Sequence, residues 1–431
     1  MKKSLIALAA LAATSAFAQS SVTLYGRAEA GVDLAYRNAN TTVTVTTPVV
    51  GGVVGTAVSS NVTSSTSKPG FRVSDGANQG LGSSRFGMRG TEDLGGGLKA
   101  NFVLEAGINI DDGSSGNGGG NLFSRAAWVG LSGGFGEVRI GRQLLGSFGV
   151  HANGLVLGAA SGLYETGATL AQGGVRFSNA IQYRSPDFGG ISGTVSLSAP
   201  ETNTNISTVV SPTQTTTSSS AGKTGVDLSV AYANGPIYVG FGLNKQNITT
   251  NSNNGLAGPA NVLTATAGPR TDYSISASYN FGVAQPFFSY VNRKDTSSSS
   301  IITGGTVTAI GGTSLLGSGV NTKGTQYALG VKVPLGAATL VTSFGSHKTT
   351  GSANDLTNTT NSTVNRKVRA FQIGGLYSLS KRTTLMANYG FNNQKDTTTG
   401  TLLTGVGAGS NAVSTSETKV RGLNFGVQHL F

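Results

Sequence analysis

The sequence contains no cysteine and little charge, and both absences limit the kind of protein that it encodes. Charged residues make up 11% of the 431 residues, against about 25% in ordinary soluble domains. Without cysteine there is no disulfide framework and no thiol or thiolate-metal chemistry. The three histidines, His151, His347 and His429, are too far apart for familiar zinc spacings. We therefore expect no metal site and no cofactor.

Motifs of catalysis and nucleotide binding are also missing. There is no Gly-x-Ser-x-Gly nucleophile elbow and no phosphate-binding loop; the Gly113–Gly120 stretch leads into neither a Lys-Ser/Thr pair nor an apolar helix. The acidic pairs Glu92-Asp93 and Asp111-Asp112 are adjacent residues, which point to opposite faces of a strand. Neither pair has EF-hand spacing. The sequence therefore predicts no enzyme.

The N-terminus has the three parts of a secretory signal peptide. Met1-Lys2-Lys3 is a positive segment, Leu5–Leu11 is a short apolar segment, and Ala16-Phe17-Ala18 fits a small-x-small cleavage site. We predict a signal peptide over residues 1–18 and one mature domain over residues 19–431. Beyond the signal peptide, no apolar run is long enough for a transmembrane helix.

The charge that is present is mostly positive. Removal of residues 1–18 takes away Lys2 and Lys3 and no acid, which leaves 28 basic and 18 acidic side chains, a surplus of 10. Such a surplus favours anionic partners. The basic residues are scattered, without a Lys/Arg run or a basic helix, so nucleic acid is not the expected partner.

The hydrophobicity is arranged with a period of two residues. In one early segment Ala28, Ala30, Val32 and Leu34 alternate with Arg27, Glu29, Gly31 and Asp33. The same alternation recurs over residues 98–105, 226–232, 237–243, 273–279, 371–379 and 385–391. This period is typical of strands with one apolar and one polar face. A barrel with lipid outside and water inside accounts for both faces, whereas a soluble sandwich would need shorter and more even loops.

Sixteen segments qualify as strands of an antiparallel transmembrane β-barrel. They are residues 21–36, 82–93, 98–110, 122–132, 136–143, 179–185, 190–199, 223–234, 236–246, 271–281, 283–294, 323–335, 337–348, 366–380, 382–394 and 417–431. Short turns alternate with long Ser/Thr/Gly-rich links at 37–81, 144–178, 200–222, 247–270, 295–322 and 395–416. Alternating short turns and long loops are typical of outer-membrane barrels. Closure leaves no unpaired strand edge in the hydrocarbon, and sixteen strands leave a water-filled lumen.

Several sequence blocks resemble the Gram-negative general porins of β-proteobacteria. They are SVTLYG (21–26), SRFGMRGTEDLGGGLKA (84–100), WVGLS (128–132), IGRQ (140–143), YRSPDFGG (183–190) and the alternating C-terminal strand that ends at Phe431. The resemblance implies an outer-membrane homotrimer embedded in lipid, with the first strands and the loop 111–121 near the trimer contact. It also implies that Phe431 is the signal read by the outer-membrane assembly machinery. His429 stands where such porins more often have an aromatic residue.

The same resemblance implies that the third external loop, residues 144–178, folds into the lumen and narrows it. Its many glycines would allow tight packing inside a barrel. By strand parity, five arginines point into the lumen: Arg85, Arg89, Arg125, Arg139 and Arg184. Arg85, Arg125 and Arg184 best match the arginine wall of the family, and Arg142 lies where it would anchor the loop.

The loop departs from the acidic character of the family. Glu165 is its one acid, with Glu105 and Asp111 as the candidates for further negative charge. Fixed guanidinium groups concentrate anions and repel cations. We therefore predict a passive, anion-leaning porin for small anionic and neutral solutes. Two alternatives stay open: a substrate-specific channel for a sugar, phosphate or carboxylate, and a surface β-protein or adhesin, although no internal repeat supports the latter.

Overall fold

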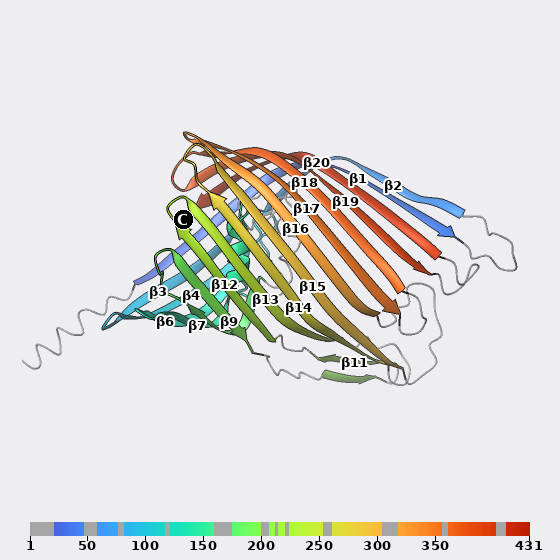
Figure 1. Ribbon diagram of the computed structural model, residues 1–431, viewed down its shortest axis with the longest axis horizontal. Helices are drawn as coiled ribbons and strands as arrows, with labels where there is room; N and C mark the ends of the chain where they lie inside the picture. Colours follow the sequence, from blue (N-terminus) through green and yellow to red (C-terminus); the bar gives the residue numbers. More distant parts are fainter. Residues whose placement is uncertain are drawn as a thin grey trace, which may run out of the picture.

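The chain forms a closed antiparallel β-barrel, seen in a computed structural model (Figure 1). The structure describes residues 21–46, 58–75, 82–116, 121–158, 175–199, 207–211, 214–219, 224–252, 261–303, 318–355, 361–401 and 411–431. The signal peptide predicted over 1–18 lies outside these ranges. Within them, no helix is both long enough and apolar enough to span a membrane.

The described elements are nearly all strands. They are β1 (Ser21–Thr46), β2 (Val58–Asp75), β3 (Arg85–Gly95), β4 (Leu98–Ile108), β5 (Ser115–Gly116), β6 (Ala126–Gly133), β7 (Gly136–Leu144), α2 (Gly146–Asn153), β8 (Arg176–Arg184), β9 (Ile191–Ser198), β10 (Ser207–Ser211), β11 (Gln214–Ser219), β12 (Thr224–Asn234), β13 (Ile237–Ser252), β14 (Asn261–Tyr279), β15 (Gln285–Thr303), β16 (Ser318–Leu335), β17 (Ala338–Asp355), β18 (Asn361–Ser378), β19 (Thr383–Thr401) and β20 (Asn411–Leu430).

The pairing of these elements gives sixteen barrel strands, as predicted. β1 pairs with β20 from Arg27↔Leu430 to Thr46↔Asn411 and so closes the cylinder. The other edge of β1 is shared, because β3 pairs with residues 21–27 and β2 pairs with residues 30–45. β2 and β3 are thus two parts of one barrel strand. β5 and the β10–β11 hairpin are additions outside the sixteen.

Several predicted strand boundaries are wrong, mostly because the hairpins continue into segments assigned to loops. The predicted link 37–81 contains the end of β1 and all of β2, and the links 247–270, 295–322 and 395–416 contain parts of β13, β14, β15, β16, β19 and β20. The link 200–222 contains the β10–β11 hairpin. β8 begins at Arg176 rather than at residue 179. Ser- and Thr-rich segments lack an apolar face, so alternation of hydrophobicity could not detect them, although threonine favours strands.

The two faces of the wall have opposite character. In β12, Asp227 and Ser229 are buried inside the barrel, whereas Val226 and Val230 are exposed on the outside. In β19, Asn388 is buried and its neighbour Tyr389 is exposed. An exposed apolar face and a hydrogen-bonded polar interior suit a barrel with lipid outside.

The wall has unequal height. β3, β4 and β6 to β9 have between 8 and 11 residues, whereas β13 to β20 have between 16 and 20. Figure 1 shows the short strands gathered on one side and the long strands on the other. The functional site lies against the inner face of the short side.

Candidate functional site: an arginine-lined cavity in the lumen

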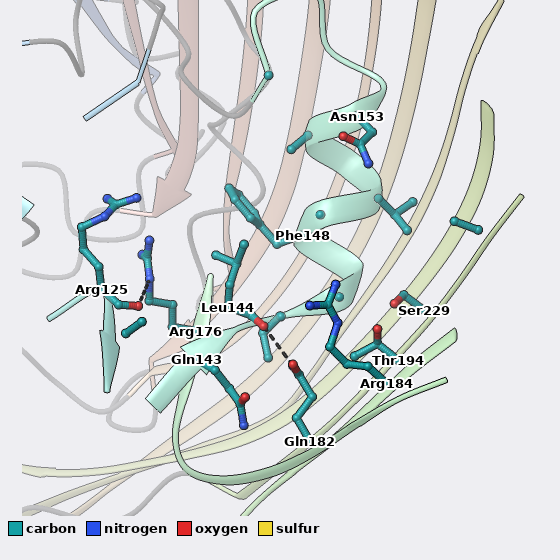
Figure 2. Close-up of a pocket in the computed structure, with 18 of the residues that line it drawn as sticks. Arg125, Gln143, Leu144, Phe148, Asn153, Arg176, Gln182, Arg184, Thr194 and Ser229 are labelled. Atoms are coloured by element: carbon teal, nitrogen blue, oxygen red, sulfur yellow. Dashed lines mark hydrogen bonds between the residues drawn. The ribbon is translucent and has the colours of Figure 1, made fainter. Parts of the chain in front are cut away.

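A cavity of about 670 Å³ inside the barrel gathers an excess of arginine side chains. Its lining includes one carboxylate, Glu105, and six arginines: Arg27, Arg85, Arg125, Arg139, Arg176 and Arg184. The arginines come from β1, β3, β7, β8 and the segment before β6. In Figure 2, Arg125 and Arg176 lie together, and Arg184 lies nearer to the N-terminal end of helix α2.

Glu105 is held among three donors from three different segments. Its Oε1 lies 2.7 Å from Arg125 Nε and 3.7 Å from Arg85 Nη1. The Tyr25 hydroxyl donates to Glu105 Oε2 over 3.0 Å. One negative charge therefore serves two guanidinium groups, and this part of the cavity keeps a positive surplus. Arg125 is itself buried, so it holds Glu105 in place more than it faces the open cavity.

The remaining arginines of the cavity are differently paired. Arg139 Nη2 lies 2.6 Å from Glu137 Oε2, and its guanidinium lies 4.0 Å from the centre of the Trp128 ring. Glu137 is absent from the cavity lining. Among the described residues, no carboxylate lies within 4.0 Å of Arg184 or Arg176. These two residues carry the least compensated charge of the cluster.

The structure places the other predicted site residues apart from the cavity. Arg89 is exposed on β3 with its guanidinium 5.3 Å from the Tyr25 ring centre. Asp111 is exposed in the turn after β4. Glu165 lies outside the described residues. Arg142 donates to the Ser124 carbonyl and to Ser178 Oγ, both over 2.6 Å, and so ties β7 to the segment before β6 and to the start of β8.

Two lining arginines were missed by the sequence reasoning. Arg27 has the lumen parity of β1, but no motif singled it out from its alternating neighbours. Arg176 was assigned to the loop because β8 was expected to begin at residue 179; in fact it is the first residue of β8. Its Nε donates over 2.8 Å to the carbonyl oxygen of Arg125, which holds the Arg176 side chain beside Arg125 (Figure 2).

Helix α2, which belongs to the described part of the predicted constriction loop, lies against the inner faces of β12 to β15. The buried Asp227 of β12 accepts hydrogen bonds from the Ser147 amide (3.2 Å), from Ser147 Oγ and from Asn244 Nδ2 (3.1 Å). A carboxylate at a helix N-terminus satisfies free amides and interacts favourably with the helix dipole. A side chain of the barrel wall therefore caps the helix inside the lumen.

Further contacts hold both ends of this segment. His151 Nδ1 lies 2.7 Å from Ser289 Oγ of β15, and both residues are buried. Leu145 packs with Phe177 and Ala180, and Val156 packs with Phe287 and Val341, in two small apolar clusters.

Glycine makes the close approach of the helix to the wall possible. A Cβ on Gly242 of β13 would lie 2.7 Å from Ser147 Cα, and one on Gly154 would lie 2.4 Å from a β15 carbonyl oxygen. A Cβ on Gly149 would face open space, so the close approach depends on Gly154 and not on Gly149.

Metal-ligand clusters do not occur in the part of the chain that the structure describes, where no three His, Asp or Glu side chains converge. The chemistry of the cavity is thus that of fixed guanidinium groups, one carboxylate and neutral polar groups.

Comparison with known proteins gives matches along the whole chain. The family model for Gram-negative porins matches residues 4–397. The chain is 32% identical to outer membrane porin protein 32 of Delftia acidovorans over 442 residues, covering all of both chains. It is 30% identical to an outer membrane porin protein of Bordetella pertussis, covering 90% of this chain and 93% of that protein.

A solved structure is also similar. The anion-selective porin from Comamonas acidovorans superimposes with a TM-score of 0.56 at 27% sequence identity, covering 96% of this chain and all of that one.

Proposed function

The chain belongs to the Gram-negative porin family, and we propose that its arginine-lined cavity makes this outer-membrane channel anion-selective. The observation that carries the proposal is the charge imbalance of the cavity, where six arginines surround Glu105. Guanidinium groups remain charged at any working pH. In a narrow, poorly screened passage they raise the local concentration of anions and repel cations. The permeant class is therefore small anionic solutes, with small neutral solutes passing by size.

The constriction is proposed to form from residues 144–178. The seating of α2 on the inner wall supports this, because that helix occupies lumen cross-section beside the arginines. Glu165 on the same segment would then oppose the arginine wall as a lone acid. The likeness to an anion-selective porin supports the same direction of selectivity.

We also propose a homotrimer that assembles through the short wall. The outer faces of β1, β3, β4, β6 and β7 form an apolar recess of about 520 Å³, lined among others by Val22, Phe102, Val129, Leu131 and Ile140. β6 has 8 residues, fewer than the about 9–11 that a tilted strand needs to cross a bilayer. Contact with a second copy would shield this short wall from lipid mismatch.

Two proposals concern export and assembly. Residues 1–18 are removed as a signal peptide, which the mass of the mature N-terminal peptide would test. Phe431 is recognised by the outer-membrane assembly machinery. Its backbone continues the closure of the barrel, with Gly26 N to Phe431 O at 2.9 Å and Phe431 N to Gly26 O at 3.1 Å.

The lumen supports the function of a channel without enzymatic activity. A substrate-specific channel is the second candidate, because the arginines would also suit a bound phosphate or carboxylate. The two differ in conductance: a specific channel would show saturable block of chloride current by its substrate, whereas a general channel would not.

The proposal is tested by removing the uncompensated charges. Arg176→Gln with Arg184→Gln should shift the zero-current potential in a KCl gradient toward cation permeation, because these two guanidinium groups have no ion-pair partner among the described residues. Lys381→Gln with Arg382→Gln is a matched control, since both side chains are exposed in the β18–β19 turn and neither lines the cavity. Equal shifts in the two double variants would show that net charge, not the cavity, sets selectivity.

A further inference from the structure

A row of lysines crosses the outside of the barrel on β17, β18 and β19. Lys348 lies directly opposite Lys367, and Lys367 lies directly opposite Lys395. All three side chains are exposed. Neighbouring strands are about 4.8 Å apart, so three ammonium groups start from adjacent positions of one surface row. Like charges directly opposite one another destabilise a sheet.

Strand parity places this row on the lipid-facing side and not in the lumen. On β17, Lys348 shares its face with the exposed Leu340 and Phe344, whereas Val341 and His347 of the other face are buried. On β19, Lys395 shares its face with the exposed Tyr389 and Phe391. The lysines therefore lie just beyond the end of the exposed apolar surface. On β17 and β19 this surface ends with an aromatic residue, Phe344 and Phe391 respectively.

The aromatic residues below the row form an interfacial girdle. The rings of Tyr327 and Phe344 lie 6.5 Å apart, and those of Phe371 and Phe391 lie 5.8 Å apart in a stacked arrangement. Aromatic girdles mark the two membrane–water interfaces of such barrels. The lysine row thus begins at the level of lipid head groups.

The basic surface extends to both sides of the three lysines. Lys294 of β15 lies directly opposite Lys323 of β16, and Arg369, Lys419 and Arg421 are exposed on the same outer face of β18 and β20. The one acid of this face among the described residues is Glu417, which lies opposite Lys395 and pairs with Lys419 at 3.3 Å. The charge is therefore strongly positive over several neighbouring strands.

The row also borders a concavity. A shallow pocket of about 380 Å³ is lined by Lys348, Lys367, Lys395, Asn365 and Thr397. Three cations and two neutral hydrogen-bonding side chains around one hollow match a phosphate group with its several acceptor oxygens. Self-repulsion among the lysines would be relieved by such an anion.

The end of the barrel at which the lysine row lies determines which leaflet of the membrane the row faces. The strands run from the row toward the longer connections after β15, β17 and β19, whereas the short turns at 336–337 and 379–382 lie at the opposite rim with Phe431. Long loops of outer-membrane barrels are extracellular and short turns are periplasmic. The row therefore faces the head groups of the outer leaflet.

We propose that the lysine row of Lys348, Lys367 and Lys395 is a binding site for the phosphate groups of outer-leaflet lipids. Lipid phosphate lies at the depth that the aromatic girdle defines, which favours a lipid over a protein partner. A juxtamembrane Lys or Arg increases the affinity for an anionic lipid surface by about a factor of five, so the three lysines together should increase it by about 100-fold.

The test measures lipid binding to the purified full-length mature protein in non-ionic detergent by native mass spectrometry. Diphosphoryl lipid A is the probe, with zwitterionic phosphatidylcholine and excess inorganic phosphate as comparisons. Lys348→Gln, Lys367→Gln and Lys395→Gln together should weaken lipid A binding about 100-fold. The same three positions changed to arginine should retain it, because the charge remains.

A matched control removes the same charge from the opposite rim. Lys99→Gln, Lys381→Gln and Arg382→Gln together should leave lipid A binding within about twofold of the wild type, because these exposed residues lie in or beside the short turns. Equal weakening in both triple variants, or unchanged binding in the row variant, would overturn the proposal. Full displacement of lipid A by inorganic phosphate would identify a free-anion site and would also overturn it. Heat-modifiable migration in gels shows that each variant still forms the barrel.

Discussion

The anchoring of helix α2 by Asp227 gives a prediction whose size follows from the structure. Asp227 belongs to β12 on the barrel wall, is fully buried, and accepts hydrogen bonds from the amide and hydroxyl of Ser147 and from Asn244. In Asp227→Ala all three donors lose their acceptor, and the first turn of the helix loses its cap.

The free energy of anchoring that Asp227→Ala removes is estimated from the hydrogen bonds alone. A hydrogen bond to a charged group contributes about 1.5–3 kcal/mol net. If only the two bonds from Ser147 are counted, at the lower end of this range, Asp227→Ala should destabilise the anchored position of α2 by about 3 kcal/mol. The ratio of anchored to detached helix then falls by about 150-fold. Asp227→Asn keeps the shape and one acceptor oxygen, so a loss of about 1 kcal/mol is expected.

Single-channel recording in planar bilayers measures this effect. Asp227→Ala should show greater open-channel current noise and closure at lower voltage, with Asp227→Asn in between. The remaining contacts, from His151 to Ser289 and from Val156 to Val341, should keep the average conductance close to that of the wild type. Noise and closing voltage in Asp227→Ala equal to those of the wild type would refute the anchoring role.

Three further predictions follow from close contacts and from charge. Gly242→Val should displace α2 and lower single-channel conductance, because even a Cβ there would lie 2.7 Å from the helix backbone. Gly149→Ala is the control: its Cβ would face open space, so this variant should have normal conductance. Phe431→Ala should reduce the amount of folded barrel in isolated outer membranes, and Gly26→Val should act similarly because its Cβ would overlap the Phe431 ring at 2.2 Å; normal levels in both would contradict a closing role for this contact. Glu105→Gln should strengthen anion preference in reversal-potential measurements, because it removes the one acid of the cavity lining, and a shift toward cations would contradict the charge assignment.

The fold was largely predictable because the membrane imposes a simple pattern on the strands. Segments such as 385–391 need an apolar face toward lipid and a polar face toward water, and this alternation is visible in the sequence. The continuations of β13 to β20 beyond their predicted ends were missed because these Ser- and Thr-rich segments lack an apolar face. No alternation is required in such segments, and they resemble loops in composition.

The site was predictable only in part, for a related reason. Parity along a strand identified Arg85, Arg125, Arg139 and Arg184, which share the cavity. Parity cannot show which lumen residues of distant strands lie at the same height, so Arg89 was grouped with the cavity, although it is stacked on Tyr25 outside it. The anchoring of α2 depends on contacts between residues 80 positions apart, Ser147 and Asp227, which no local pattern encodes.

Anion selectivity set by the arginine-lined cavity is tested most directly by the zero-current potential of the wild-type protein in a planar bilayer with a KCl gradient. We predict stepwise conductance with chloride permeating better than potassium, and a preference that weakens as ionic strength rises, because salt screens the guanidinium charges. A preference for potassium would contradict the account, since it would mean that carboxylates rather than the six arginines of the cavity dominate selectivity.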